Sequence, residues 1–218
     1  MIGSRDWSLP LAVASLVCLG AMLGIGVVTG VSQETFEVVR PAAVYAAGLR
    51  EHGTALRALF GIDSAFLVLY TAFFVVFGRR IATDDTRALI TIASGFIFTT
   101  VFFDMVEDHH ILAMLNAAEA GSDPTAGQIV LQQTVSQVKF NLSYVALFLY
   151  GLAVPRRTRA GLALSLLLTV GTLVQGVWLY AAPASMLPAG NLGRGLGFMI
   201  GFALAIPIIR DRARQRAD

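Results

Sequence analysis

Five charged residues stand inside long apolar segments of this sequence, where a charge is costly. Asp104, Glu107 and Asp108 occur together in the run Phe-Phe-Asp-Met-Val-Glu-Asp-His-His. Asp63 and Lys139 interrupt two other apolar segments. Placing an ionisable residue in a membrane costs about 2.5–3.5 kcal/mol on insertion scales, so such residues normally face a bundle interior or water and mark a functional site. These five residues are therefore the first candidates for chemistry.

The spacing of the polar residues predicts two polar helix faces. Asp104, Glu107 and Asp108 are three and four positions apart, so they share one face of a helix. A second stripe follows the same spacing and comprises Gln132, Ser136, Lys139 and Ser143. Polar stripes on membrane helices should face the bundle interior or water rather than lipid. We therefore expect the two stripes to face each other and to form a binding site. Its candidate ligand-binding residues are Asp63, Asp104, Glu107, Asp108, Lys139 and Asn141.

The charges of this candidate site do not balance. Its four acidic residues would carry four negative charges if ionised, against one positive charge on Lys139. In a low-dielectric site some carboxylates must therefore be protonated, reach water or hold a cation. A divalent cation is the candidate cofactor, with Asp63, Asp104, Glu107 and His110 as its candidate ligands. Adjacent helical residues point about 100° apart, so only one of His109 and His110 can join that face.

The composition predicts a membrane protein. Hydrophobic residues make up 56% of the chain and charged residues only 14%, whereas soluble domains carry about a quarter charged residues. Lipid is therefore the natural solvent, and the bilayer is the expected partner. The net charge is only +2 and the basic residues lie mostly at the ends of apolar segments, so we expect no nucleic-acid partner. Cys18 is the only cysteine, which excludes an intrachain disulfide and a cysteine metal cage.

Six stretches are long and apolar enough to cross a bilayer, which takes about 20 residues. They cover residues 9–31, 56–78, 88–115, 129–154, 160–182 and 192–209. The first is longer than a signal-peptide core and lacks an A-x-A-like cleavage site, so we interpret it as a span. The longest connection, residues 32–55, is compatible with either an interfacial amphipathic helix or a polar loop. We therefore expect residues 1–218 to form one all-α domain, a six-helix transmembrane bundle.

The distribution of arginine predicts the orientation of these spans. Arginines gather in the second and fourth connections and at both ends of the chain, at Arg5, Arg79, Arg80, Arg87, Arg156, Arg157, Arg159, Arg210, Arg212, Arg214 and Arg216. The connection of residues 116–128 has none. The positive-inside rule then puts both termini in the cytoplasm. At 1.5 Å per residue, Asp63 lies about 10 Å from the outer end of its span and Asp104 about 24 Å from the inner end, so both fall in the outer half.

Lys139 is the only lysine among sixteen basic residues, and Ala and Gly are abundant. This bias suggests a GC-rich bacterial genome and hence a multi-pass protein of the inner membrane. Within the last apolar stretch, Gly197 and Gly201 form a G-x-x-x-G pair. That pattern predicts close approach of another helix, which we expect inside the monomer rather than at a dimer face. The oligomeric state is not determined by the sequence.

The sequence leaves three classes of function open. The preferred one is binding or translocation of a cation, a proton or a small amine-bearing ligand, with Lys139 as internal counter-ion. The second is a membrane enzyme acting on a lipid or isoprenoid at the outer leaflet, with a carboxylate as metal ligand or general base. The third is an accessory subunit of a larger membrane complex. No Walker loop, G-x-S-x-G elbow or H-E-x-x-H motif occurs to decide between them.

Overall fold

The computed structural model describes residues 6–181 and 187–214, and all the regular structure in these residues is helical. The elements are α1 (Ser8–Thr29), η1 (Gln33–Phe36), α2 (Ala42–Ile81), α3 (Arg87–Glu119), α4 (Ala126–Ala153), α5 (Arg159–Leu166), η2 (Leu167–Gly171), α6 (Thr172–Ala181) and α7 (Leu187–Arg214). α5, the π-helical turn η2 and α6 follow one another without a break, so they form one rod. The prediction of an all-α chain is confirmed for these residues.

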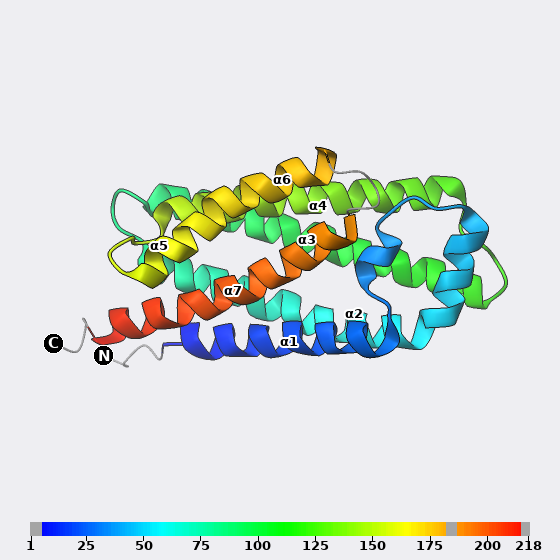
Figure 1. Cartoon of the computed structure of the whole chain (residues 1–218), viewed down its shortest axis with the longest axis horizontal. Coiled ribbons are helices and arrows are strands. Elements are labelled where there is room, and N and C mark those ends of the chain that lie inside the picture. Colours follow the sequence, from blue (N-terminus) through cyan, green and yellow to red (C-terminus); the bar gives the residue numbers. More distant parts are fainter. Residues whose placement is uncertain (1–5, 182–186, 215–218) are drawn as a thin grey trace.

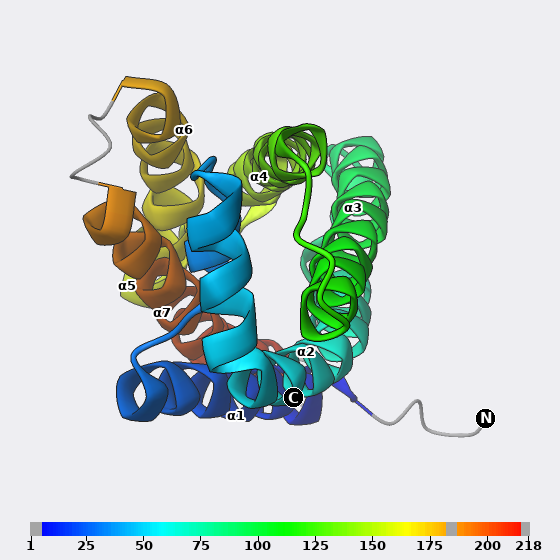
Figure 2. The same ribbon diagram turned by 90° about the vertical axis from the view of Figure 1, so that its right-hand side faces the viewer.

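The helical rods form a ring in chain order. Each rod contacts the next, and α7 closes the ring by packing against α1. Figure 1 shows the start of α1 and the end of α7 at the same end of the bundle. η1, the first turns of α2 and the connection between α3 and α4 lie at the opposite end (Figures 1 and 2). We call the first end the arginine end, because Arg80 lies in the last turn of α2 and Arg156 follows the end of α4.

Local capping explains where several helices begin and end. α4 starts with a capping box, in which the Thr125 hydroxyl accepts from Gln128 N and the Gln128 side chain accepts from Thr125 N. Thr158 caps α5 by accepting a hydrogen bond from Gly161 N. α1 ends at Gly30, whose φ of 71° is left-handed and favours glycine. These signals set the short connections of the ring.

Within the described residues, five of the rods are long and apolar enough to cross a membrane: Ser8–Thr29, Ala42–Ile81, Arg87–Glu119, Arg159–Trp178 and Gly190–Asp211. The chain therefore has the character of a multi-pass membrane protein. α4 is 28 residues long, but it is not among these five. Its polar stripe lowers its hydropathy, and the stripe is buried: Gln132, Ser136, Lys139 and Ser143. Six spans are therefore not established by length and composition alone.

Two boundaries differ from the sequence-based expectation. Residues 42–55 are helical and not a polar loop, because they form the first turns of the 40-residue helix α2. Figures 1 and 2 show these first turns running across the end of the bundle, at a steep angle to the rest of α2. The remainder of α2, residues 56–81, runs along the bundle and at 1.5 Å per residue is about 39 Å long, which exceeds the roughly 30 Å thickness of a hydrocarbon core. α7 begins at Leu187, before the expected start of the last span at residue 192, so Arg194 lies in its second turn.

Two apolar clusters lie along the bundle, with polar residues between them. In α2, Phe60 belongs to the cluster at the η1 end and Phe66 to the cluster at the arginine end, and Asp63 falls between them. The same order holds in α3, where the acidic run lies between Ile97 and Ile111. It holds again in α4, where Lys139 lies between Ile129 and Ala146. Three helices thus bring charged residues to one level of the bundle.

Candidate functional site

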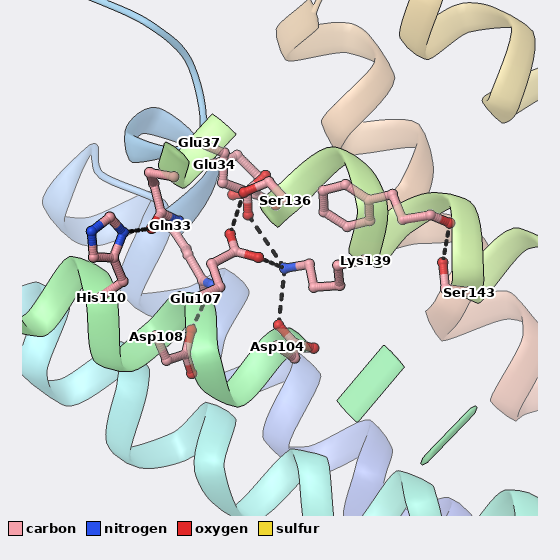
Figure 3. Close-up of polar contacts among 12 residues, drawn as sticks. Gln33, Glu34, Glu37, Asp104, Glu107, Asp108, His110, Ser136, Lys139 and Ser143 are labelled. Carbon is pink, nitrogen blue, oxygen red and sulfur yellow. Dashed lines mark hydrogen bonds and ion pairs between the residues drawn. The ribbon is translucent and has the colours of Figure 1, made fainter. Parts of the chain in front are cut away.

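The centre of this level is the ammonium group of Lys139, which projects from α4 and is 5% exposed. Its Nζ lies 2.6 Å from Glu107 Oε2 and 2.9 Å from Asp104 Oδ1, both on α3 (Figure 3). A third carboxylate, Glu37 Oε1, lies 3.7 Å away. We call Lys139 with Glu37, Asp104 and Glu107 the lysine cluster. The two polar helix faces expected from the sequence meet here.

Glu107 is held in place by a second donor. Its side chain is 0% exposed, and its Oε1 accepts a hydrogen bond of 2.7 Å from Ser136 Oγ. Ser136 lies one helical turn from Lys139 on the stripe of α4, so the spacing of that stripe places the hydroxyl and the ammonium group beside the same Glu107 carboxylate. The charge-assisted contacts fix Glu107 against α4.

Glu37 reaches the lysine cluster because η1 is anchored to the start of α2. Tyr45 Oη donates a buried hydrogen bond of 2.8 Å to the carbonyl of Phe36. The rings of these two residues also pack edge to face with centroids 5.3 Å apart, and Phe36 is 2% exposed. Glu37 follows Phe36 directly, so this anchor sets the position of its carboxylate. Sequence reasoning missed Glu37, because a glutamate in a long connection carries no sign of burial.

A second cation, Arg194 of α7, approaches the same carboxylate. Its Nη2 lies 3.7 Å from Glu37 Oε2 and 3.7 Å from Glu34 Oε1. Its guanidinium also lies over the ring of Phe140, 3.5 Å from the centroid. Sequence reasoning likewise missed Glu34, which falls in the connection of residues 32–55, and Arg194, which falls at the start of the stretch of residues 192–209. The available signal was that Arg194 is the only basic residue between Arg159 and Arg210.

Three aspartates lie close together where α2 packs against α3. One carboxylate oxygen from each of Asp63, Asp104 and Asp108 lies within 4.8 Å of the others. Asp108 Oδ1 accepts a hydrogen bond of 2.7 Å from Gln33 Nε2. Asp63 is 8% exposed, and its Oδ2 finds no hydrogen-bond donor in the described part of the chain. We call these three residues the aspartate triad; their oxygens are of the type that hard divalent cations prefer.

The structure divides the candidate metal ligands differently from the sequence-based expectation. Asp63 and Asp104 lie in the aspartate triad, but Glu107 faces Lys139 instead. His110 Nδ1 forms a hydrogen bond of 2.8 Å with Gln132 Oε1, and His110 is not part of the triad. The reason is helical geometry: Glu107 and Asp108 are adjacent, so they point about 100° apart. α3 lies between α2 and α4 in the ring, so one residue faces each neighbour.

Asn141 and His109 form hydrogen bonds with groups outside the lysine cluster and the aspartate triad. Asn141 Nδ2 donates to the Gln137 carbonyl at 2.8 Å and to Tyr180 Oη at 2.6 Å, which ties α4 to α6. His109 is exposed, and its Nδ1 lies 2.7 Å from the Met105 carbonyl. The structure therefore does not bring Asn141, expected among the ligand-binding residues, into contact with the acidic side chains.

The pKa of Glu37, which lies in the connection between α1 and α2, stands well above its ordinary value. Burial is the main cause, since it disfavours the ionised carboxylate, and the negative charge of Glu107 adds to it. Lys139 and Arg194 lower the pKa of Glu37 and only partly offset these effects. Glu37 is therefore suited to take up a proton at this end of the bundle.

The whole site is acidic. Its described carboxylates are Glu34, Glu37, Asp63, Asp104, Glu107 and Asp108. Its cations are Lys139 and Arg194. Six negative charges against two positive charges leave an excess of four if every group is ionised. Since isolated buried charges cost several kcal/mol each, the site is suited to binding protons or a cation.

No protein-family model, curated protein or solved structure matches this chain. Fold and site alone therefore define the class. The chain is an all-helical protein, in the residues described, with membrane-type helices and a buried cluster of carboxylates around one lysine.

Proposed function

We propose that this chain is a six-span membrane protein that binds a divalent cation at the aspartate triad. The observation that carries the proposal is the convergence of three carboxylate oxygens within 4.8 Å, one of them on a buried Asp63 with an unpartnered Oδ2. A divalent cation would halve the excess of four negative charges. The raised pKa of Glu37 supports a proton as a further neutralising charge.

The burial of the α4 stripe supports the sixth span. At 28 residues, α4 is about 42 Å long and exceeds the hydrocarbon thickness of about 30 Å. Its charged and polar stripe is buried, while Val130, Leu131, Val145 and Leu152 are exposed on its outer side. This is the pattern of a membrane helix with a polar interior face.

The arginine end supports an orientation with both termini in the cytoplasm. The start of α1 and the end of α7 lie at that end, where arginines flank the connections after α2 and α4. The aspartate triad and the lysine cluster then lie nearer the outer surface. We place the protein in the inner membrane of a bacterium on its composition and this arginine bias.

Two roles are compatible with a cation at this site. In the preferred role the cation, or a proton in its place, is bound or carried by the bundle, and Lys139 is a fixed counter-ion. In the second role the cation serves a membrane enzyme acting on a lipid or isoprenoid. An apolar cavity that Arg194 lines favours this second role, because Arg194 also contacts Glu37 of the lysine cluster.

Titration of Mn²⁺ into protein purified in mild detergent, followed by calorimetry and by elemental analysis, tests the proposal. We expect one bound ion per chain in the parent and loss of binding in Asp63→Asn, because the unpartnered carboxylate is removed. Asp85→Asn is the matched control, since Asp85 is exposed and distant from the triad in the chain. A parent without bound metal, or equal binding in Asp63→Asn, would refute cation binding at the triad.

A further inference from the structure

An apolar cavity of about 290 Å³ lies between α2, α4, the α5–α6 rod and α7. Its volume is close to the lower end of the range of about 300–1,000 Å³ that is typical of ligand pockets. The wall on α2 is aromatic and includes Phe73 and Phe74, and Phe198 and Phe202 contribute from α7. The cavity is distinct from the aspartate triad, none of whose residues lines it.

Two backbone features keep this space open. An added Cβ on Gly197 of α7 would have nothing within 4 Å, and one on Gly201 would meet only Leu167 Cδ2, at 3.8 Å. The close helix approach expected at this glycine pair is therefore absent at Gly197. On the opposite wall, η2 is a π-helical turn from Leu167 to Gly171, and Leu167, Leu168 and Gly171 line the cavity. Such turns widen a helix locally and are frequent at functional sites. The glycine and the π-turn therefore leave room that closely packed helices would fill.

The cavity opens toward the outer side of the bundle. Val174 of α6 lines it and is 58% exposed, so this residue forms its rim. Leu173 and Val177 on the same turns of α6 are also exposed. These apolar side chains lie on a helix of membrane-type length and hydropathy, Arg159–Trp178. In a bilayer the opening past Val174 would therefore face hydrocarbon chains.

Part of the cavity lining is polar. Tyr144, Gln175 and Arg194 belong to this part and carry hydroxyl, amide and guanidinium donors. Gln175 Nε2 lies 3.0 Å from the place of a Cβ on Gly193, so this amide sits directly against α7. Donors in the lining of an apolar cavity suit the oxygen acceptors that join a hydrocarbon chain to a lipid headgroup. Arg194 also contacts Glu34 and Glu37, so this part of the lining adjoins the candidate site.

We propose that this cavity binds one hydrocarbon chain of a membrane lipid, which enters past Val174 and places its ester or acid oxygens against Arg194. The inference rests on the membrane setting of the proposed function but not on cation binding. Arg194 would then contact two sets of acceptors, the lipid oxygens on one side and Glu34 and Glu37 on the other. A bound lipid would then alter the position of Arg194 and thereby the charge next to Glu37.

Photolabelling tests this inference. The probes are phosphatidylglycerol with a diazirine in one acyl chain, and a diazirine-bearing hexadecane without a headgroup, each mixed with the detergent-solubilised full-length protein. We expect both probes to label residues on η2 and α7 that line the cavity. Gly197→Leu fills the space and should abolish this labelling. Gly95→Leu is the matched control, because a Cβ on Gly95 also meets nothing within 4 Å, on an exposed face of α3.

A headgroup role for Arg194 makes a separate prediction. Arg194→Gln should reduce labelling by the phospholipid and leave labelling by the hexadecane unchanged. Equal labelling of the cavity in Gly197→Leu and in the parent would overturn the inference. Labelling of Leu173 on the outer side of α6 reports the membrane-type surface, and Mn²⁺ titration of the parent and of Gly197→Leu reports the triad. Loss of either of these signals in the parent indicates failure of the proposed function, and loss of cavity labelling alone indicates failure of the lipid site.

Discussion

Removal of the Lys139 ammonium should strongly destabilise the folded protein at neutral pH. In Lys139→Ala, Glu107 and Asp104 lose a cation at 2.6 Å and 2.9 Å, and Glu107 has no exposure to water to compensate. Breaking a buried ion pair by removing one partner costs about 3–5 kcal/mol, because the remaining charge is left uncompensated. For a domain of 150–250 residues, each kcal/mol shifts the melting temperature by about 2–4 °C, so the expected loss is about 6–20 °C.

Lower pH should partly restore the stability of Lys139→Ala, because protonation removes the uncompensated negative charge. The direction follows from linkage. The pKa of Glu37 is raised in the folded protein, so its contribution to stability is fully present below its unfolded pKa and is lost as pH rises through its folded pKa. Removal of Lys139 takes away a positive charge that lowers the pKa of Glu37. The pH range over which the contribution of Glu37 to stability is lost should therefore move to higher pH in the variant.

The assay is thermal unfolding in detergent between about pH 5 and 8, the range in which raised carboxylate pKa values titrate. Lys139→Arg retains the charge and should melt closer to the parent than Lys139→Ala at pH 8. Arg87→Ala is the matched control for loss of a cation, because Arg87 and Asp84 form an exposed pair with little expected contribution. If Lys139→Ala melts like the parent at every pH, the lysine cluster does not stabilise the fold and the charge argument fails.

Three further predictions follow from the same charges and from the topology. A reporter fused after Asp218 should be active only as a cytoplasmic fusion, and activity of a periplasmic reporter there would refute the orientation. Asp104→Asn should destabilise the protein less than Lys139→Ala, because it reduces the negative excess, yet it should abolish Mn²⁺ binding; retained binding would remove Asp104 from the triad. Glu37→Gln should flatten the dependence of the melting temperature on pH, with the largest gain over the parent at pH 8, and an unchanged pH profile would show that Glu37 does not titrate in this window.

The local polar faces of α3 and α4 could be predicted from the sequence alone. The spacing of Asp104 and Glu107, and of Ser136 and Lys139, follows the helical period, and a helix relates residues three and four apart without help from the rest of the chain. The cost of charge in an apolar segment then indicates that these faces turn inward. Both faces are buried, and their residues are in contact.

The membrane character of the chain was also determined by the sequence, because hydropathy and segment length are properties of composition. The exact number of spans was not, since α4 combines an apolar outer side with polar residues that face inward. Mean hydropathy adds both sides together, whereas burial separates them. The stripe on α4 is buried in the assembled ring of helices, as its spacing predicted.

Only the tertiary structure decided which partners complete the site. Glu37 and Arg194 are more than 150 positions apart in the chain, and no local rule relates a loop carboxylate to a guanidinium on α7. Their meeting depends on the anchoring of Phe36 against Tyr45 and on closure of the ring by α7. The division of Glu107 and Asp108 between two neighbours likewise required the positions of α2 and α4. Local spacing sets where a side chain points on its own helix, but long-range packing sets what it meets there.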